Sequence, residues 1–121
     1  MMSRVKSTKY SAERRLDLVF RALGDQTRRA LLARLARRPA MVTELAEPFA
    51  MSLPAVSRHI RVLEGAGLVV RNVDGRVHRC SLGTRPLKSV EAWLRTYRHF
   101  WEGSLEALAR YVASGEKKKH R

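Results

Sequence analysis

The segment VTELAEPFAMSLPAVSRHIRVLEGAGL, residues 42–68, decides how this chain folds. Apolar residues recur at helical spacing in both of its halves, first at Leu45, Ala46 and Phe49 and then at Val56, Ile60 and Leu63. Ser52 precedes the second run and can cap a helix there, and Pro54 falls in the first turn, where its missing N–H costs little. Gly65 and Gly67 favour a helix end. The segment therefore predicts two short amphipathic helices joined by a tight turn.

The outward face of the second predicted helix indicates what it contacts. Once its apolar residues turn inward, the side chains that face outward are those of Ala55, Ser57, Arg58 and Arg61. A short helix that presents small, hydroxyl and guanidinium side chains has the size and the hydrogen-bonding groups for the major groove of DNA. We interpret the segment as a helix-turn-helix whose second helix recognises DNA.

The composition agrees with a nucleic-acid partner. The 121 residues include 25 Lys and Arg against 11 Asp and Glu, which gives a formal net charge of +14. This charge indicates a polyanionic partner, nucleic acid before acidic lipid. The apolar content of 45% argues against disorder. We expect one domain over residues 11–113, between a flexible basic N-terminal arm at 1–10 and a basic C-terminal tail at 114–121.

The apolar runs and the cysteine content narrow the class of protein. No apolar run approaches the ~20 residues that span a bilayer, and no signal-peptide core follows the basic start, so we expect a cytoplasmic protein without membrane contact. The one cysteine, Cys80, excludes an intramolecular disulfide and a closed thiolate zinc site. Cys80 is either a small buried apolar residue, which is the commoner case, or a redox switch assisted by the nearby His78.

Two helices are expected ahead of the helix-turn-helix. Ser11 can cap the first, whose apolar stripe comprises Leu16, Val19, Phe20 and Leu23. Asp25 can cap the second, which spans residues 26–37. The second helix carries several arginines, among them Arg28 and Arg29, which either belong to its solvated face or contact DNA phosphates. The sequence leaves both alternatives open.

A β-hairpin is expected directly after the helix-turn-helix. The segment LVVRNVDGRVHRCSL, residues 68–82, is rich in valine and contains Asp74-Gly75, a strong hairpin-turn signal, although the register is left open. A hairpin in this place is a wing. Its tip would present Arg76, with His78 and Arg79 on the return strand, to phosphate or the minor groove. The alternative is that these are exposed residues of an ordinary hairpin.

A long amphipathic helix is expected to follow from near Thr84 and Pro86. Apolar residues recur three or four positions apart at Leu87, Val90, Leu94, Tyr97, Trp101, Leu105, Leu108 and Val112. A helix of about 26 residues would be ~39 Å long and would present more apolar surface than one small domain covers. A symmetric homodimer is the commonest partner for such a surface. It would also place two recognition helices in successive major grooves, ~34 Å apart.

The order helix, helix, helix-turn-helix, hairpin, long helix resembles the winged-helix ArsR/SmtB repressor family. The segments that carry the resemblance are FRALGDQTRRALLARL (20–35), VTELAEPFAMSLPAVSRHIRVLEGAGLV (42–69), DGRVHRCSL (74–82) and WLRTYRHFWEGSLEAL (93–108). It implies a mainly α fold with a small β-hairpin, in the order α-α-α-α-β-β-α. It also implies a bacterial or archaeal repressor that is homodimeric through its first and last helices and holds double-stranded operator DNA with helix four and the wing.

The resemblance and the patterns above together give the candidate site residues. The candidates for DNA contact are Ser52, Leu53, Pro54, Ala55, Ser57, Arg58, Arg61, Arg76 and Arg79. Ser57 and Arg58 would read bases, Arg61, Arg76 and Arg79 would meet phosphate, and Leu53 and Pro54 would offer apolar contact with a thymine methyl. The candidates for the dimer interface are Leu16, Phe20, Leu94, Tyr97, Trp101, Leu105 and Leu108.

The chain departs from this family at both of its familiar metal sites. Where many relatives carry two cysteines in an ELCxC segment, residues 44–48 read ELAEP. A second kind of zinc site pairs Asp-x-His with His-x-x-His/Glu. His99 and Glu102 match its second half, but Pro86 and Lys88 occupy the first. We therefore expect no metal and no cofactor, with His99 and Glu102 as polar helix residues, and the inducer stays unknown.

Two other classes of function are weighed against a sequence-specific repressor. An enzyme would need a nucleophile with its base, a carboxylate pair or a phosphate loop. No GxSxG, Walker or HExxH motif occurs, so we expect no catalytic residues. A sequence-tolerant architectural DNA or RNA binder would use the same positive charge without selecting a site. Protection of a short inverted repeat would distinguish the repressor from this alternative.

Overall fold

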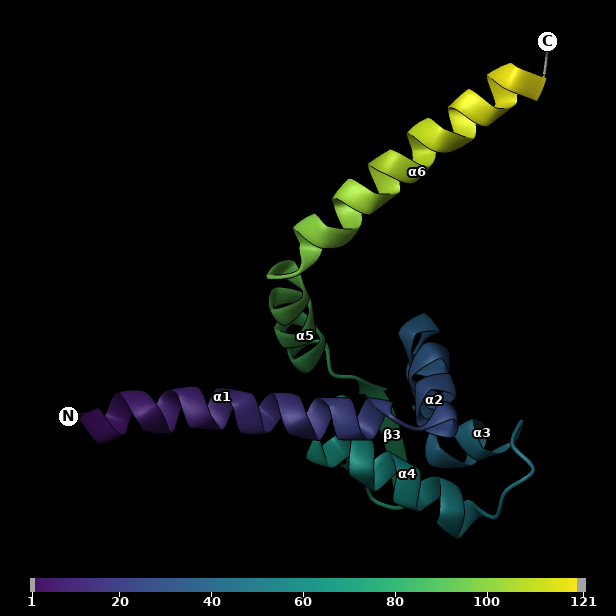
Figure 1. The fold of residues 1–121 in the computed structure, drawn as a ribbon. Helices are drawn as coiled ribbons and strands as arrows, with labels where there is room; N and C mark the ends of the chain where they lie inside the picture. The colour runs from purple at the N-terminus through teal and green to yellow at the C-terminus, as the bar shows by residue number, and fades with distance from the viewer. Residues whose placement is uncertain (1, 120–121) are drawn as a thin grey trace. The chain divides into compact units, whose positions relative to one another are not determined.

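The computed structural model describes the backbone of residues 2–119 and the side chains of residues 11–115. Its elements, in chain order, are α1 (Met2–Leu23), α2 (Gln26–Arg37), β1 (Ala40–Met41), α3 (Val42–Ala46), α4 (Leu53–Gly65), β2 (Val69–Asp74), β3 (Val77–Leu82), α5 (Arg85–Arg95) and α6 (Arg98–Lys119), as Figure 1 shows. The chain divides into two compact units, residues 1–90 and residues 91–121. Among the described residues, no helix has the length and apolar character to cross a bilayer.

The first unit is built on one apolar core. Its buried residues are Val19, Ala22, Leu31, Leu32, Leu35, Ala40, Leu45, Val56, Ile60, Leu63, Leu68, Val69 and Cys80. They come from α1 to α4 and from all three strands, with α1 packed on both α2 and α4. The inward face predicted for the recognition helix is confirmed, because Val56, Ile60 and Leu63 are fully buried. Burying this face fixes which side of α4 points outward.

The caps predicted for α2 and α4 are confirmed. The Asp25 carboxylate accepts a 3.1 Å hydrogen bond from the Arg28 N–H, and the Ser52 hydroxyl accepts one of 3.3 Å from the Ala55 N–H. Helix α4 ends as a Schellman turn, in which Leu68 and Gly67 donate to the carbonyls of residues 63 and 64. This turn requires a left-handed residue, and Gly67 supplies it with φ of 75°.

The three strands form one antiparallel sheet in the order β1-β3-β2. The wing hairpin pairs Val69 with Leu82 and Asp74 with Val77, so its loop has two residues, Gly75 and Arg76. Because φ is positive at Gly75 (62°) and at no non-glycine residue of the described chain, the turn has the type II′ pattern. The predicted wing is confirmed, with the turn centred one residue beyond Asp74-Gly75.

Three predicted boundaries are wrong. Helix α1 begins at Met2 rather than Ser11, because residues 2–10 contain neither glycine nor proline to stop a helix from extending backwards. The flexibility proposed for the arm at 1–10 stays a prediction. Phe49 lies beyond the end of α3 at Ala46 and packs on the core from the turn. The predicted long helix is interrupted between Arg95 and Arg98.

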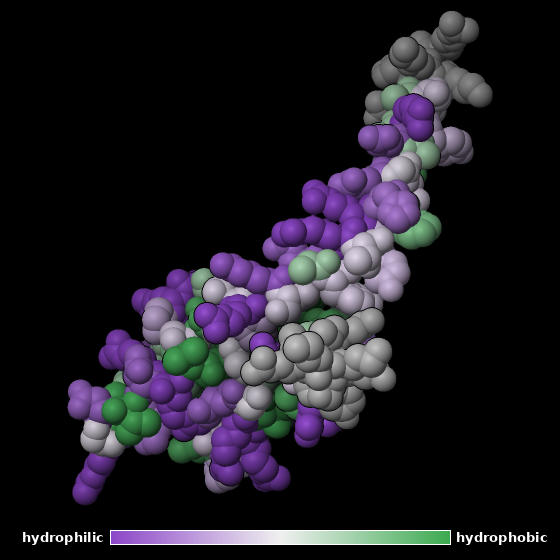
Figure 2. Space-filling model, turned by 90° about the vertical axis from the view of Figure 1, so that its left-hand side faces the viewer, coloured by the Kyte–Doolittle hydropathy of each residue, from purple (hydrophilic) through white to green (hydrophobic). Residues whose placement is uncertain are grey.

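Hydrogen bonds of Thr96 explain this interruption. Its N–H and its hydroxyl both donate to the Trp93 carbonyl, at 3.2 and 2.7 Å, and the Tyr97 N–H donates to Leu94. These bonds span three residues instead of four, so the α-helical ladder ends there. On both sides of this break, no side chain among residues 91–115 is buried. Figure 2 shows apolar residues in green at the surface along α6, between hydrophilic residues in purple.

Candidate nucleic-acid interface

The outer face and N-terminal end of α4 hold most of the predicted base-reading residues. Ser52, Leu53, Pro54 and Arg58 are exposed there, with Leu53 exposed to 47% although it is apolar. Ala55 and Ser57 are half-buried, and Arg61 is exposed one turn beyond Arg58. The N-terminal end of α4 therefore presents hydroxyl, methyl and guanidinium groups together, which are groups that recognise base edges in a major groove.

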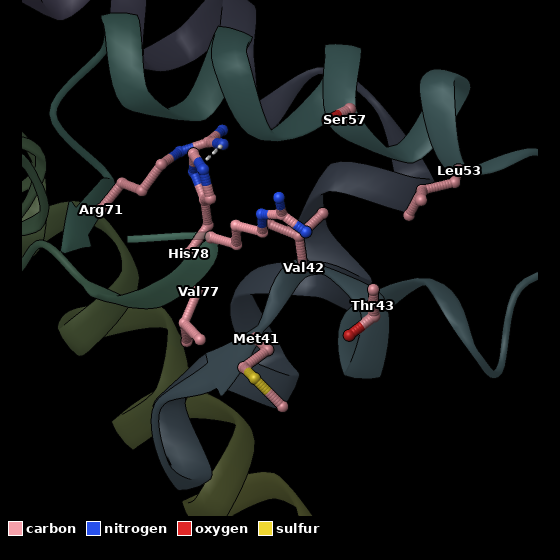
Figure 3. Close-up of a pocket in the computed structure, with 9 residues that line it drawn as sticks. Met41, Val42, Thr43, Leu53, Ser57, Arg71, Val77 and His78 are labelled. Atoms are coloured by element: carbon pink, nitrogen blue, oxygen red, sulfur yellow. Dashed lines mark hydrogen bonds between the residues drawn. The ribbon is translucent and has the colours of Figure 1, made fainter. Parts of the chain in front are cut away.

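A groove of about 320 Å³ lies between α4 and the wing (Figure 3). Helix α4 contributes Leu53 and Ser57, and the turn of the hairpin contributes Arg76. His78, which the sequence also placed on the DNA-facing side of the wing, lines the groove as well. The remaining lining residues were not predicted from the sequence; they are Met41, Val42 and Thr43 from β1 and α3, and Arg71 and Val77 from the wing. We call this the α4–wing groove. It brings a predicted base-reading helix and a predicted phosphate-binding arginine to the same surface.

Arg71 holds the wing against α4. Its guanidinium donates to the Glu64 carboxylate from Nη2 at 2.6 Å and from Nε at 3.1 Å, and its Nη1 lies 3.3 Å from His78 Nδ1. The Arg71 side chain is only 17% exposed, so water screens this ion pair less than one at the surface. We call these three residues the Arg71 clasp. It connects the last turn of α4 to both strands of the wing.

The four predicted DNA-contacting arginines have no acidic partner within residues 11–115. Arg58 and Arg61 are exposed on α4, Arg76 forms the second residue of the hairpin turn, and Arg79 is exposed on β3. None of their side chains makes an ion pair or hydrogen bond in that range, in contrast to Arg71. Guanidinium groups without an internal acceptor retain all their donors for phosphate oxygens or base edges.

Arg28 and Arg29 have a structural role that the sequence did not indicate. Arg28 Nε donates to the Ala22 carbonyl at 2.6 Å, and Arg29 Nη1 donates to the Leu23 carbonyl at 2.7 Å. Carbonyls in the last turn of a helix have no partner within that helix, so these arginines cap the C-terminal end of α1. This capping role accounts for both arginines without any contact with DNA phosphate.

His59 extends from α4 and packs against the start of α2. Its Nδ1 lies 3.3 Å from Arg28 Nη1 and 4.0 Å from the Asp25 carboxylate. The hydrogen bond from the Arg28 N–H, together with the charges of His59 and Arg28, lowers the pKa of Asp25, although desolvation opposes this. The His59 side chain is only 19% exposed, as expected for a residue that packs between helices.

Cys80 belongs to the buried core, whereas His99 and Glu102 lie on the exposed surface of α6. Cys80 is fully buried, and this burial raises the pKa of its thiol, so the reactive thiolate is disfavoured. Glu102 accepts a 2.6 Å hydrogen bond from Arg98, and the His99 ring lies against Phe100 with their centroids 4.0 Å apart. Among the described side chains, no three His, Cys, Asp or Glu residues lie close enough to hold a metal ion.

The predicted dimer residues form two sets. Leu16 is half-buried and Phe20 is 40% exposed on α1. The other five lie on α5, on α6 or between them and are exposed by between 39% and 60%; they are Leu94, Tyr97, Trp101, Leu105 and Leu108. Trp93, which was not in the predicted set, packs its ring edge against Tyr97 with a centroid separation of 5.1 Å. Apolar surface therefore continues across the break between α5 and α6.

Comparison with known proteins agrees with this architecture. A helix-turn-helix domain family matches residues 23–72. The HTH-type transcriptional regulator Rv2034 of Mycobacterium tuberculosis is 36% identical over 104 residues, which are 86% of this chain and 94% of that protein. The crystal structure of an ArsR family transcriptional regulator is 46% identical and has a TM-score of 0.69, over 74% of this chain and 93% of that one. The chain belongs to the ArsR family of transcriptional regulators.

Two further proteins are similar to this ArsR-family protein, one in sequence and one in structure. The transcriptional repressor SdpR of Bacillus subtilis is 30% identical, over 68% of this chain and 91% of its own. A homodimeric winged helix-turn-helix domain from Mycobacterium bovis has a TM-score of 0.57 and 20% identity, over 78% of this chain and 84% of that chain, which supports the fold alone. This chain is therefore a DNA-binding transcriptional regulator with a winged helix-turn-helix, and its family consists of regulators rather than enzymes.

Proposed function

We propose that this ArsR-family regulator is a repressor that binds an inverted-repeat operator as a homodimer. The observation that carries the proposal is the α4–wing groove, where Leu53 and Ser57 face the same space as Arg76. A recognition helix in the major groove needs the neighbouring phosphate strand to be held at a fixed distance, and a wing beside the helix does this.

Six of the nine candidate residues receive a role from their position. Ser57 and Arg58 read base edges from the outer face of α4, and Leu53 offers apolar contact to a thymine methyl. Arg61, Arg76 and Arg79 contact phosphate; their side chains form no ion pair within residues 11–115. Binding through these arginines depends strongly on salt, whereas the choice of operator depends on the residues at the N-terminal end of α4.

Exposed apolar residues of α5 and α6 support the homodimer. Trp101 is 40% exposed, and Leu105 and Leu108 are exposed by 60% and 56%. A surface of this kind on a DNA-binding chain fits a second copy, because two-fold symmetry then matches an inverted repeat. The homodimeric domain from Mycobacterium bovis and the repressor SdpR provide precedents for dimerisation and for repression in two similar proteins.

Fluorescence anisotropy on the full-length protein tests the proposal. The probe is DNA from upstream of the protein's own gene, the control is a scrambled duplex of equal length, and both run at ~0.15 M salt. We expect the upstream DNA to bind more tightly by ~10³-fold or more, with protection of one inverted repeat. Equal affinity for the two duplexes, together with no protected repeat anywhere in a genomic selection, would favour the sequence-tolerant architectural binder instead.

A further inference from the structure

A second pocket lies on the first unit, at the end of α4 that is remote from its base-reading residues. It has a volume of about 300 Å³. Helix α1 contributes Arg15 and Leu18, the Schellman turn of α4 contributes residues 64–67, and the start of α5 contributes Arg85 and Ser89. All of these residues belong to residues 1–90. We call it the α4-end pocket, and none of the predicted DNA-contacting residues lines it.

The backbone around this pocket is closely packed, so its walls are pre-formed. A Cβ atom at Gly67 would lie 3.1 Å from Pro86 Cγ, and one at Gly83 would collide with the Gly67 carbonyl oxygen. Gly83 also donates to the Leu68 carbonyl at 2.8 Å, which fixes the segment between β3 and α5 against the end of α4. A pocket with fixed walls binds a ligand without the entropy cost of ordering a loop.

The charges around the α4-end pocket select an anion. Arg15 and Arg85 line it, and neither side chain has an acidic partner within residues 11–115. Helix α5 begins at Arg85, so its positive N-terminal end adds to the two guanidinium groups. Glu64 also lines the pocket, but Arg71 already neutralises its carboxylate. The carbonyls of residues 62–64 at the end of α4 already accept hydrogen bonds from residues 66–68.

Most of the remaining lining is apolar, which limits what else the ligand contains. Leu18, Val19 and Pro86 face the pocket beside the two arginines. Pockets of about 300 Å³ accept small organic molecules. We propose that the α4-end pocket binds a small aromatic or aliphatic carboxylate, with its apolar body against Leu18 and its carboxylate between Arg15 and Arg85.

The same pocket is connected to the DNA-binding surface through Glu64. Glu64 lines the pocket and belongs to the Arg71 clasp, which continues to His78 on the wing. A carboxylate bound in the pocket places a second negative charge beside Glu64, and repulsion between the two carboxylates shifts Glu64 within the clasp. Resting on the proposed function, this ligand acts as an effector that changes operator affinity, because two sites that share one conformational element are thermodynamically coupled.

Nuclear magnetic resonance titration of the full-length, DNA-free protein with benzoate tests binding. The neutral isostere benzamide is the matched control, and both titrations keep ionic strength constant because the chain is strongly basic. We expect saturable shifts of the amides of Val19, Gly67 and Ser89, and at least tenfold weaker binding of benzamide. Equal binding of the two compounds, or shifts scattered over the surface, would overturn the carboxylate site.

Three variants and one control locate the site. Arg15→Gln and Arg85→Gln each remove one guanidinium, and Ser89→Phe fills the pocket from an exposed position on α5. We expect the first two to weaken benzoate binding at least fivefold and the third to abolish it. Arg37→Gln makes the same charge change on the exposed end of α2 and should leave binding unchanged. An equal loss in Arg37→Gln would show that benzoate responds only to net charge and would overturn the proposal.

A separate measurement tests the effector role. Operator affinity is measured by anisotropy with and without saturating benzoate, in the wild-type protein and in Ser89→Phe. We expect at least a threefold change in the wild type and none in the variant. An unchanged affinity would overturn the effector role. Failure to bind any operator would refute the proposed function instead, and the DNA-free titration would still decide whether the α4-end pocket binds a carboxylate.

Discussion

The two units of this chain use their apolar side chains in opposite ways. In residues 11–90, thirteen buried residues from helices and strands pack together, and Ile60 and Leu63 are completely inaccessible. In residues 91–115, every side chain is exposed, including Trp101 and Leu105. A helix gains most of its stability from packing an apolar face, and the described side chains of α6, up to residue 115, are all exposed in the single chain. The first unit has an apolar core of its own, whereas the proposed homodimer would cover the apolar side chains of the second.

The largest expected effect comes from placing a charge on the exposed apolar face of α6. Trp101→Asp should produce monomers and lower operator affinity by about 10²–10⁴-fold, because the second recognition helix would no longer bind at high effective concentration. Analytical ultracentrifugation and anisotropy measure the two effects. Gly103→Asp is the matched control, because it adds the same charge where an added Cβ meets no other atom. A Trp101→Asp protein that stays dimeric would contradict the proposed interface.

Truncating one apolar residue in each unit tests whether the two units differ in how their apolar side chains are packed. Ile60→Ala creates a cavity in a fully buried site and should lower the free energy of unfolding by about 2–5 kcal/mol at any protein concentration. Leu108→Ala removes a residue that is 56% exposed in one copy, so its cost should depend on protein concentration. Urea denaturation at two concentrations tests this difference. A concentration-independent loss in Leu108→Ala would mean that α6 packs within its own chain.

Two arginines of the DNA-binding surface should respond differently to substitution. Arg58→Ala should cost about 1–3 kcal/mol on the operator and less on scrambled DNA, because a base contact is lost. Arg76→Gln should weaken both duplexes equally and reduce the salt slope by about one, because a phosphate contact is lost. Salt titrations followed by anisotropy distinguish the two results. Equal losses on both duplexes in Arg58→Ala would reassign that side chain to the phosphate backbone.

The smallest expected effect concerns Cys80 and alkaline pH. Burial raises the pKa of its thiol in the folded protein. An unfolded thiol ionises at about pH 8.5. The unfolded state therefore loses a proton first, so the stabilisation is complete below about pH 8.5 and decreases as pH rises towards the folded-state pKa. Cys80→Ala should remove this part of the pH dependence between about pH 7.5 and 9.5. Identical slopes for the two proteins would show that the thiol ionises equally in both states.

The elements that sequence analysis placed correctly are specified by neighbouring residues. The side chains of Asp25 and Ser52 each accept a hydrogen bond from the N–H three residues later, and so cap a helix. Gly67 takes the left-handed conformation that ends α4. The spacing of Val56 and Ile60 fixes the buried face of the recognition helix in the same way. Local patterns of this kind require no knowledge of the rest of the fold.

The features that sequence analysis missed depend on segments that meet only after folding. Arg28 looks like a solvated helix residue until the last turn of α1 is placed beside it. In the sequence, Arg71 is an ordinary residue of a valine-rich strand. Only the fold places Glu64 2.6 Å from its guanidinium. The break at Thr96 is different, because a threonine hydroxyl bonded to the Trp93 carbonyl competes with a helix that the apolar spacing still favours.

The Arg71 clasp gives the wing the mechanics of a lever. Its pivot is the contact between Arg71 and Glu64, and its free end is the two-residue turn at Gly75 and Arg76. At about 3.3 Å per residue, that turn lies about 16 Å beyond the pivot, so a rotation of about 10° moves the tip by about 3 Å. This displacement equals the length of a hydrogen bond. A rearrangement too small to unfold any element at the pivot is therefore large enough at the tip to separate an arginine from a phosphate.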